Sequence, residues 1–159
     1  MLMRRGDGTT LASLLLSSLA LLFASGCFLA DPDQPGRIAL QLDQTGVIAR
    51  TVLCDHSPPT VKSVRMTGPG GPNDLRWAIE SEGIKLQQFT IGFTPPGFQE
   101  THPLNQPIMP GTHYLLSVHA VQLADPLVLE FELGALRADS WLLKHNKRLS
   151  EATLNSDPC

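Results

Sequence analysis

The chain has 159 residues and a formal net charge of −3 at pH 7, with 12 Lys and Arg residues against 15 Asp and Glu residues. This length is enough for one domain with a single hydrophobic core. A surface that binds nucleic acid needs a concentration of basic side chains, and we interpret the basic cluster of Lys144, Lys147 and Arg148 as an ordinary solvated face. The composition therefore argues against a nucleic-acid partner.

Residues 11–27 form an apolar run that ends in small residues and a cysteine. Arg4 and Arg5 precede this run, as in a secretory signal, and it is too short to span a bilayer comfortably as a permanent helix. The small residues before Cys27 resemble the lipobox of bacterial lipoproteins. That resemblance implies a signal peptide over residues 1–26, lipid attached to Cys27, and a location at the extracytoplasmic face of the cell membrane.

The sequence contains three cysteines. If lipid occupies Cys27, Cys54 and Cys159 remain as an even pair, and two such cysteines in an exported chain are expected to form a disulfide. The bridge would close a loop of about a hundred residues, for which the chain-entropy model gives roughly 4–5 kcal/mol at most. It would hold the C-terminus to the start of the core.

Two strands are expected to open the folded domain. Residues 27–36 are rich in Pro and Asp and are expected to form a short tether, so the domain spans residues 37–159. Alternating apolar residues predict a strand over residues 37–43 and a second over residues 47–53. The turn between them allows a hairpin.

Five further strands are predicted, and Pro and Gly residues separate them, at residues 60–67, 75–80, 88–93, 113–121 and 127–133. Residues 81–83 are expected to turn the chain, and residues 98–107 show no alternating pattern. About seven short strands at regular spacing predict an all-β fold, an antiparallel immunoglobulin-like sandwich.

The C-terminal segment has a different spacing. Leu142, His145, Leu149 and Ala152 are three or four residues apart, which predicts a short helix beginning near Asp139 or Ser140. An irregular tail laid on the sandwich fits the same residues. Both alternatives remain open.

Residues 108–121 resemble the sixth strand of a fibronectin type III domain. They contain an apolar residue, Pro-Gly-Thr, one variable residue, and then Tyr114 followed by alternating apolar positions. Trp77 is similar to the tryptophan of that family's second strand, and residues 89–93 are similar to its third. The resemblance covers roughly residues 60–136 and implies that the Tyr114 hydroxyl caps a loop backbone group. The chain as a whole also resembles short uncharacterised secreted lipoproteins.

We find no motif for catalysis, a metal or a cofactor. Asp55, His56 and Ser57 are consecutive, so their side chains cannot converge as a triad and are expected to be turn residues. His113 and His119 share a strand face, but six residues of strand separate them by about 20 Å, too far to share one ion. The protein is therefore not expected to be an enzyme.

The loop over residues 94–98 is the candidate contact surface. Phe98 follows Pro95 and Pro96 and can act as an exposed aromatic anchor for an envelope protein or a cell-wall polymer. Alternatively, Phe98 folds back onto the end of the sandwich.

The sequence therefore predicts a membrane-anchored, non-catalytic binding or structural module of the cell envelope. The alternative is a cell-envelope hydrolase, or a protein accessory to an enzyme, with a site near the loops that hold His56 and His102.

Overall fold

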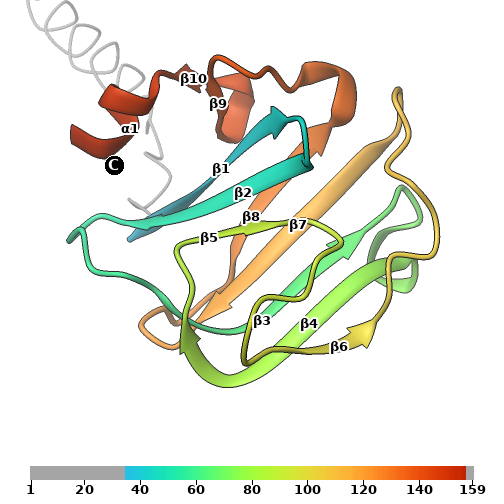
Figure 1. The fold of residues 1–159 in the computed structure, drawn as a ribbon, viewed down its shortest axis with the longest axis horizontal. Coiled ribbons are helices and arrows are strands. Elements are labelled where there is room, and N and C mark those ends of the chain that lie inside the picture. Colours follow the sequence, from blue (N-terminus) through green and yellow to red (C-terminus); the bar gives the residue numbers. More distant parts are fainter. Residues whose placement is uncertain (1–34, 157–159) are drawn as a thin grey trace, which may run out of the picture. The chain divides into compact units, whose positions relative to one another are not determined.

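The computed structural model describes residues 35–156, so the predicted signal peptide, Cys27 and Cys159 lie outside the described residues. The described elements belong to one unit, Asp33–Cys159. They form two antiparallel sheets of five strands each (Figure 1). The predicted all-β sandwich is confirmed. No helix among these residues has both the length and the apolar character needed to cross a bilayer.

The first sheet is built on the predicted hairpin. Its strand order is β10-β9-β1-β2-β5, with bounds Arg148–Leu149, Trp141–Leu142, Gly36–Asp43, Gly46–Leu53 and Gln88–Thr90. β1 and β2 pair along their whole length. The Asp43 carboxylate closes the turn because it accepts hydrogen bonds from the backbone N–H groups of Thr45 and Gly46. β1 begins at the last residue of the expected tether.

The second sheet has the order β6-β4-β3-β7-β8, with bounds Gln99–His102, Leu75–Lys85, Thr60–Thr67, His113–Ala120 and Leu127–Glu132. β7 buries Tyr114 and every second residue after it, and β8 buries Leu127, Leu129 and Phe131. These buried faces are the predicted ones. Between the two sheets lies the main core, which includes the fully buried residues Leu40, Met66, Trp77 and Leu116.

Two predicted strand ends are wrong. No turn occurs at residues 81–83, because β4 continues to Lys85 through an irregularity in its pairing with β3. At this irregularity the Ser81 hydroxyl donates to the Val61 carbonyl, and the Gly83 N–H donates to Ser81 Oγ. These bonds satisfy polar groups that the sequence pattern assigns to a turn. β5 is shorter than expected and ends at Thr90.

β6 was not predicted. Its sequence, Gln99–His102, has no buried residue and no apolar alternation. It forms because it lies at the edge of the second sheet, where backbone pairing with β4 suffices to hold it.

Of the two alternatives for the C-terminal segment, a helix that begins near Asp139 or Ser140 is wrong, and the irregular tail is also incomplete because short strands form there. Trp141–Leu142 form β9, which pairs with β1 opposite Leu40, and β10 pairs with β9. The described part of the chain also contains three 3₁₀-helices, η1 at Gly71–Asn73 before β4, η2 at Leu133–Ala135 and η3 at Lys144–Asn146. α1 begins only at Glu151 and ends at Ser156.

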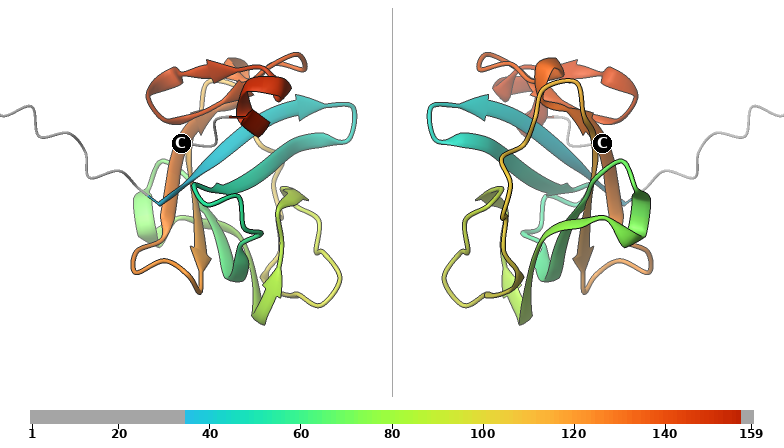
Figure 2. Two further views of the ribbon diagram at one scale, coloured as in Figure 1. Left: turned by 90° about the vertical axis from the view of Figure 1, so that its left-hand side faces the viewer. Right: turned by 90° about the vertical axis from the view of Figure 1, so that its right-hand side faces the viewer.

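This segment covers the outer face of the β1–β2 hairpin, as both views of Figure 2 show. A second apolar cluster forms there, from Ala39, Val52, Trp141, Leu143 and Leu154. Leu142 instead belongs to the main core. Neighbouring residues around β9 therefore face opposite clusters, the period of a strand, and this explains why the helical spacing misled the prediction.

Candidate functional site

Tyr114 makes the contact that the resemblance implies. Its hydroxyl accepts a hydrogen bond of 3.0 Å from the backbone N–H of Met109, and its ring lies 5.7 Å from that of Phe131, measured between centroids. The bond fixes the loop that leads into β7. This role is structural.

The loop over residues 94–98 does not present Phe98 to solvent. Phe98 is 8% exposed and belongs to the main core. This confirms the alternative prediction, in which Phe98 folds back onto the end of the sandwich. The chain reverses at Gly97, where φ is +83°, and the next side chain therefore returns to the sandwich. An aromatic side chain that does face solvent is Phe93, which is 62% exposed. A partner contact through Pro95 and Pro96 stays a prediction.

Asp55, His56 and Ser57 form a turn, as expected. The Ser57 hydroxyl and backbone N–H both donate to Asp55 Oδ1, at 2.6 and 2.9 Å. These two bonds, the hydroxyl first, hold the pKa of Asp55 below its ordinary value. The aspartate therefore orients the turn and makes no hydrogen bond to the imidazole of His56.

The structure does not bring His56 and His102 together. His56 follows β2 of the first sheet and lines a small pocket of about 50 Å³. His102 ends β6, at the edge of the second sheet, and is not among the residues that line this pocket. Within residues 35–156, no group of three or more His, Cys, Asp and Glu residues is placed to hold a metal ion.

The half-buried Cys54 directly follows β2, and its backbone N–H donates to the Pro35 carbonyl at 3.0 Å. Its predicted disulfide partner Cys159 lies outside the described residues, so the pairing stays a prediction, as does the lipid on Cys27.

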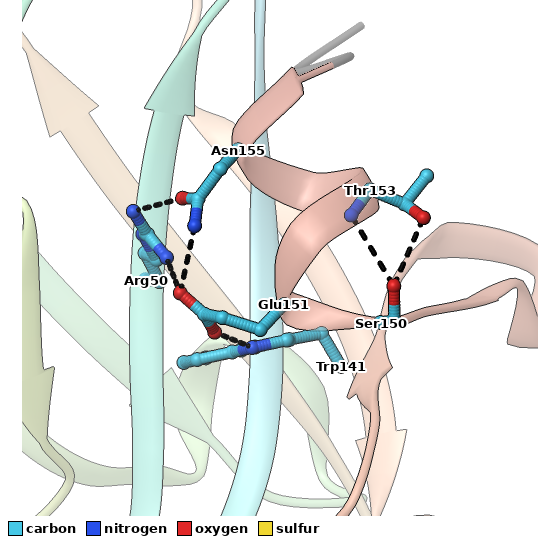
Figure 3. A network of polar contacts seen from close by, with 6 residues as sticks. All are labelled: Arg50, Trp141, Ser150, Glu151, Thr153 and Asn155. Carbon is cyan, nitrogen blue, oxygen red and sulfur yellow. Dashed lines mark hydrogen bonds and ion pairs between the residues drawn. The ribbon is translucent and has the colours of Figure 1, made fainter.

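A polar network that the sequence did not reveal attaches α1 to β2 (Figure 3). Arg50 of β2 lies 2.6 Å from Glu151 and donates to Asn155 at 2.7 Å. The indole N–H of Trp141 donates to the other oxygen of Glu151, and the Arg50 guanidinium lies 6.0 Å from the Trp141 ring centroid. We call these four residues the Glu151 network.

The Glu151 network determines the charge state of its carboxylate. Burial by itself raises the pKa of Glu151, but hydrogen bonds from Trp141, Arg50 and Asn155 outweigh burial and hold this pKa below its ordinary value. The carboxylate accepts all of these bonds. We therefore assign the network to attachment of the C-terminal segment.

The best candidate site is a groove of about 630 Å³ beside β8, which we call the β8 groove. One side is formed by His113 and Leu115 of β7 and by residues 128–132 of β8, and the other by Ala135 and η3. Along residues 128–132, exposed or half-buried side chains alternate with the buried side chains of Leu129 and Phe131. Its apolar floor includes the partly exposed Leu115 and Val128.

The acidic groups of the β8 groove lie on one strand, β8, and Lys144 of η3 also lines the groove. Glu130 lies 3.3 Å from His113, and Glu132 accepts the backbone N–H of Gly111 at 3.0 Å. Ser117 shares the face of His113, but four residues of strand place them about 13 Å apart, which is too far for a nucleophile and its base. The arrangement suits contact with a ligand better than acid–base chemistry.

The wall formed by η3 has an unusual backbone. His145 and Asn146 have φ values of +59° and +58°, in the left-handed region that residues other than glycine seldom adopt. Such conformations persist where the surrounding structure holds them, and β9 and β10 flank η3 on either side.

Comparisons of the chain with protein-family models, with curated proteins and with solved structures found no match. The function is therefore argued from the geometry of the β8 groove and from the N-terminal sequence.

Proposed function

We propose that this protein is a membrane-anchored module of the cell envelope that binds a partner without catalysis. The β8 groove is the observation that carries the binding part of the proposal. Its volume falls in the range of about 300–1,000 Å³ that is usual for ligand sites. Like most such sites, it combines apolar residues with a few charged groups.

The anchoring part rests on residues 11–27. The apolar run, the arginines before it and the small residues before Cys27 support removal of residues 1–26 and attachment of lipid to Cys27. The protein would then act at the extracytoplasmic face of the membrane. The resemblance to fibronectin type III domains belongs to the same proposal and is supported by the Tyr114 contact.

We also propose a disulfide between Cys54 and Cys159. Arg50 and Asn155 are hydrogen-bonded, and each precedes one of the two cysteines by four residues. This contact supports the pairing because it brings the end of α1 beside β2. The enzyme alternative, with a site near His56 and His102, has no comparable support, since these residues lie on different sheets.

Metabolic labelling with a clickable fatty acid tests the anchor. We expect label on the wild-type chain and on Cys159→Ser, which keeps Cys27, but none on Cys27→Ala. In the same samples, reduction should add two hydrogen atoms to the intact mass of the wild type and none to that of Cys159→Ser. Label on Cys27→Ala would refute the anchor, and an unchanged wild-type mass would refute the bridge.

A further inference from the structure

The two walls of the β8 groove carry charges of opposite sign. Glu130 and Glu132 belong to the wall formed by β8, and Lys144 belongs to the wall formed by η3. A ligand with charges of only one sign would meet a like charge on one of the walls, which is costly in an interface. The groove therefore favours a ligand with a positive group at one end and a negative group at the other.

The acidic wall has room for an ammonium group. Glu130 lies 3.3 Å from His113, and Glu132 accepts the backbone N–H of Gly111. An ionised carboxylate has acceptor positions for several hydrogen bonds, so each glutamate can accept more than this one contact. The two glutamates are alternate residues of a strand, about 7 Å apart along it. An ammonium group, with its three N–H donors, can therefore be shared between them.

The opposite wall suits a carboxylate. All three residues of η3 are exposed and line the groove. The ammonium of Lys144 has three N–H donors, so it can bind a carboxylate in addition to another partner. The imidazole of His145 and the side-chain amide of Asn146 can form hydrogen bonds to amide groups of a ligand.

The size and the floor of the groove determine what lies between the two charged groups. In a free amino acid the ammonium and the carboxylate are attached to one carbon atom, so they cannot reach separate walls. A tripeptide can extend by up to about 10 Å. Its middle side chain can then cover Leu115 and Val128, which are 39% and 37% exposed. The groove volume of about 630 Å³ is in the range of sites for such ligands.

We propose that the β8 groove binds a short peptide by its two charged ends. The N-terminal ammonium contacts Glu130 and Glu132, and the C-terminal carboxylate contacts Lys144. An apolar side chain between the ends covers the floor of the groove. This inference rests on the proposed function, because it names the ligand class of the same groove.

Titration calorimetry of the full chain, purified in detergent, with the tripeptide alanyl-leucyl-alanine tests this inference. We expect saturable binding of one peptide per chain. N-acetylation removes the ammonium and C-terminal amidation removes the carboxylate. Each change should weaken binding about tenfold or more, because it removes hydrogen bonds between charged groups. These modifications leave the protein unaltered, so a folding defect cannot produce the result.

Variants of the protein assign each end of the peptide to a wall. When Glu130→Gln and Glu132→Gln are combined, acetylation should have no further effect, whereas amidation should keep its effect. In Lys144→Gln the reverse is expected. Glu82→Gln and Lys85→Gln change exposed residues of β4 that do not line the groove. These matched controls should bind all three peptides as the wild type does.

Three results would overturn the proposal. The first is absence of binding of the unmodified tripeptide. The second is equal binding of the free and the modified peptides, or sensitivity to modification of one end only, because recognition would then not involve two charged ends. The third is a dimer that excludes the peptide, detected by light scattering, which would assign the groove to a second copy of the chain.

The failure of each proposal can be recognised separately. If Cys27 carries lipid but the tripeptide does not bind, the peptide ligand is refuted and the anchor is retained. If the tripeptide binds but Cys27 carries no lipid, the anchor is refuted and the groove is retained.

Discussion

The outer faces of the two sheets differ in how far the rest of the chain covers them. The outer face of β1 and β2 carries Ala39 and Val52, and the C-terminal segment covers it with Trp141, Leu143 and Leu154. The outer face of β7 and β8 stays open, with partly exposed Leu115 and Val128 beside charged residues. The chain itself covers the first face and pairs its Arg50 with Glu151, whereas the second face keeps Leu115 and Val128 exposed.

One segment links the two faces. β9, β10 and α1 cover the first sheet, and η3, which lies between β9 and β10, forms a wall of the β8 groove. The position of this wall therefore depends on how firmly the segment is packed on β1 and β2. The variants below test how far the covered and the open face differ in their contribution to stability.

The largest effect is expected from Trp141→Ala on the covered face. Trp141 is 3% exposed and packs in the second cluster. Its removal should cost about 3–5 kcal/mol, the usual cost for a buried aromatic residue. Urea unfolding followed by circular dichroism measures this loss of stability. Trp141→Phe should lose less stability than Trp141→Ala. A loss below about 1 kcal/mol for Trp141→Ala would mean that the segment does not stabilise the sandwich.

A smaller effect is expected from Glu151→Gln, and it should depend on pH. The pKa of Glu151 is held below its ordinary value of 4.5. The ionised carboxylate therefore stabilises the folded state above that value, and its contribution is lost as the pH falls through the folded-state pKa. Because the Glu151 side chain is 58% exposed, we expect at most about 1 kcal/mol.

Unfolding of wild type and Glu151→Gln at pH 7 and at pH 3 measures this contribution. The difference should be present at pH 7 and should be smaller at pH 3, which lies below the ordinary pKa of 4.5. Glu80→Gln, whose carboxylate pairs with Arg65 on the surface, is the control, since both side chains of this pair are about half exposed. A difference that is the same at both pH values would contradict the role of charge.

The smallest effect is expected on the open face. Val128→Thr keeps the branched shape that suits a strand and changes a partly exposed side chain, so the free energy of unfolding should change by less than about 0.5 kcal/mol. The same urea titration measures it. A loss of 2 kcal/mol would show that this face is packed against part of the chain, and the β8 groove would then not be free to bind.

Much of the fold was predictable because apolar alternation reports burial on one face. The hairpin of β1 and β2 and the strands β3, β7 and β8 follow from such patterns. The Tyr114 contact was expected from the resemblance to fibronectin type III domains. β6 was not predictable because its residues are exposed and pairing alone holds it. The segment after residue 138 was misjudged because Trp141 and Leu142 serve two different clusters.

The candidate site could not be predicted from the sequence, for another reason. Glu130 and Glu132 could be assigned to the outward face of a strand, but their place at an open edge depends on the order of the strands in the sheet. Phe98 could be named as an aromatic loop residue, yet its direction depends on the reversal at Gly97. Both properties arise from tertiary structure.

The attachment of the last segment to the first hairpin also determines the order in which the protein folds. Arg50 and Glu151 are 101 residues apart in the chain. β9 cannot pair with β1, nor can Trp141 cover Ala39, until nearly the whole chain has been made. Closing so long a loop slows folding. During synthesis the hairpin therefore remains uncovered on one side, and the protein most needs protection from aggregation in that interval.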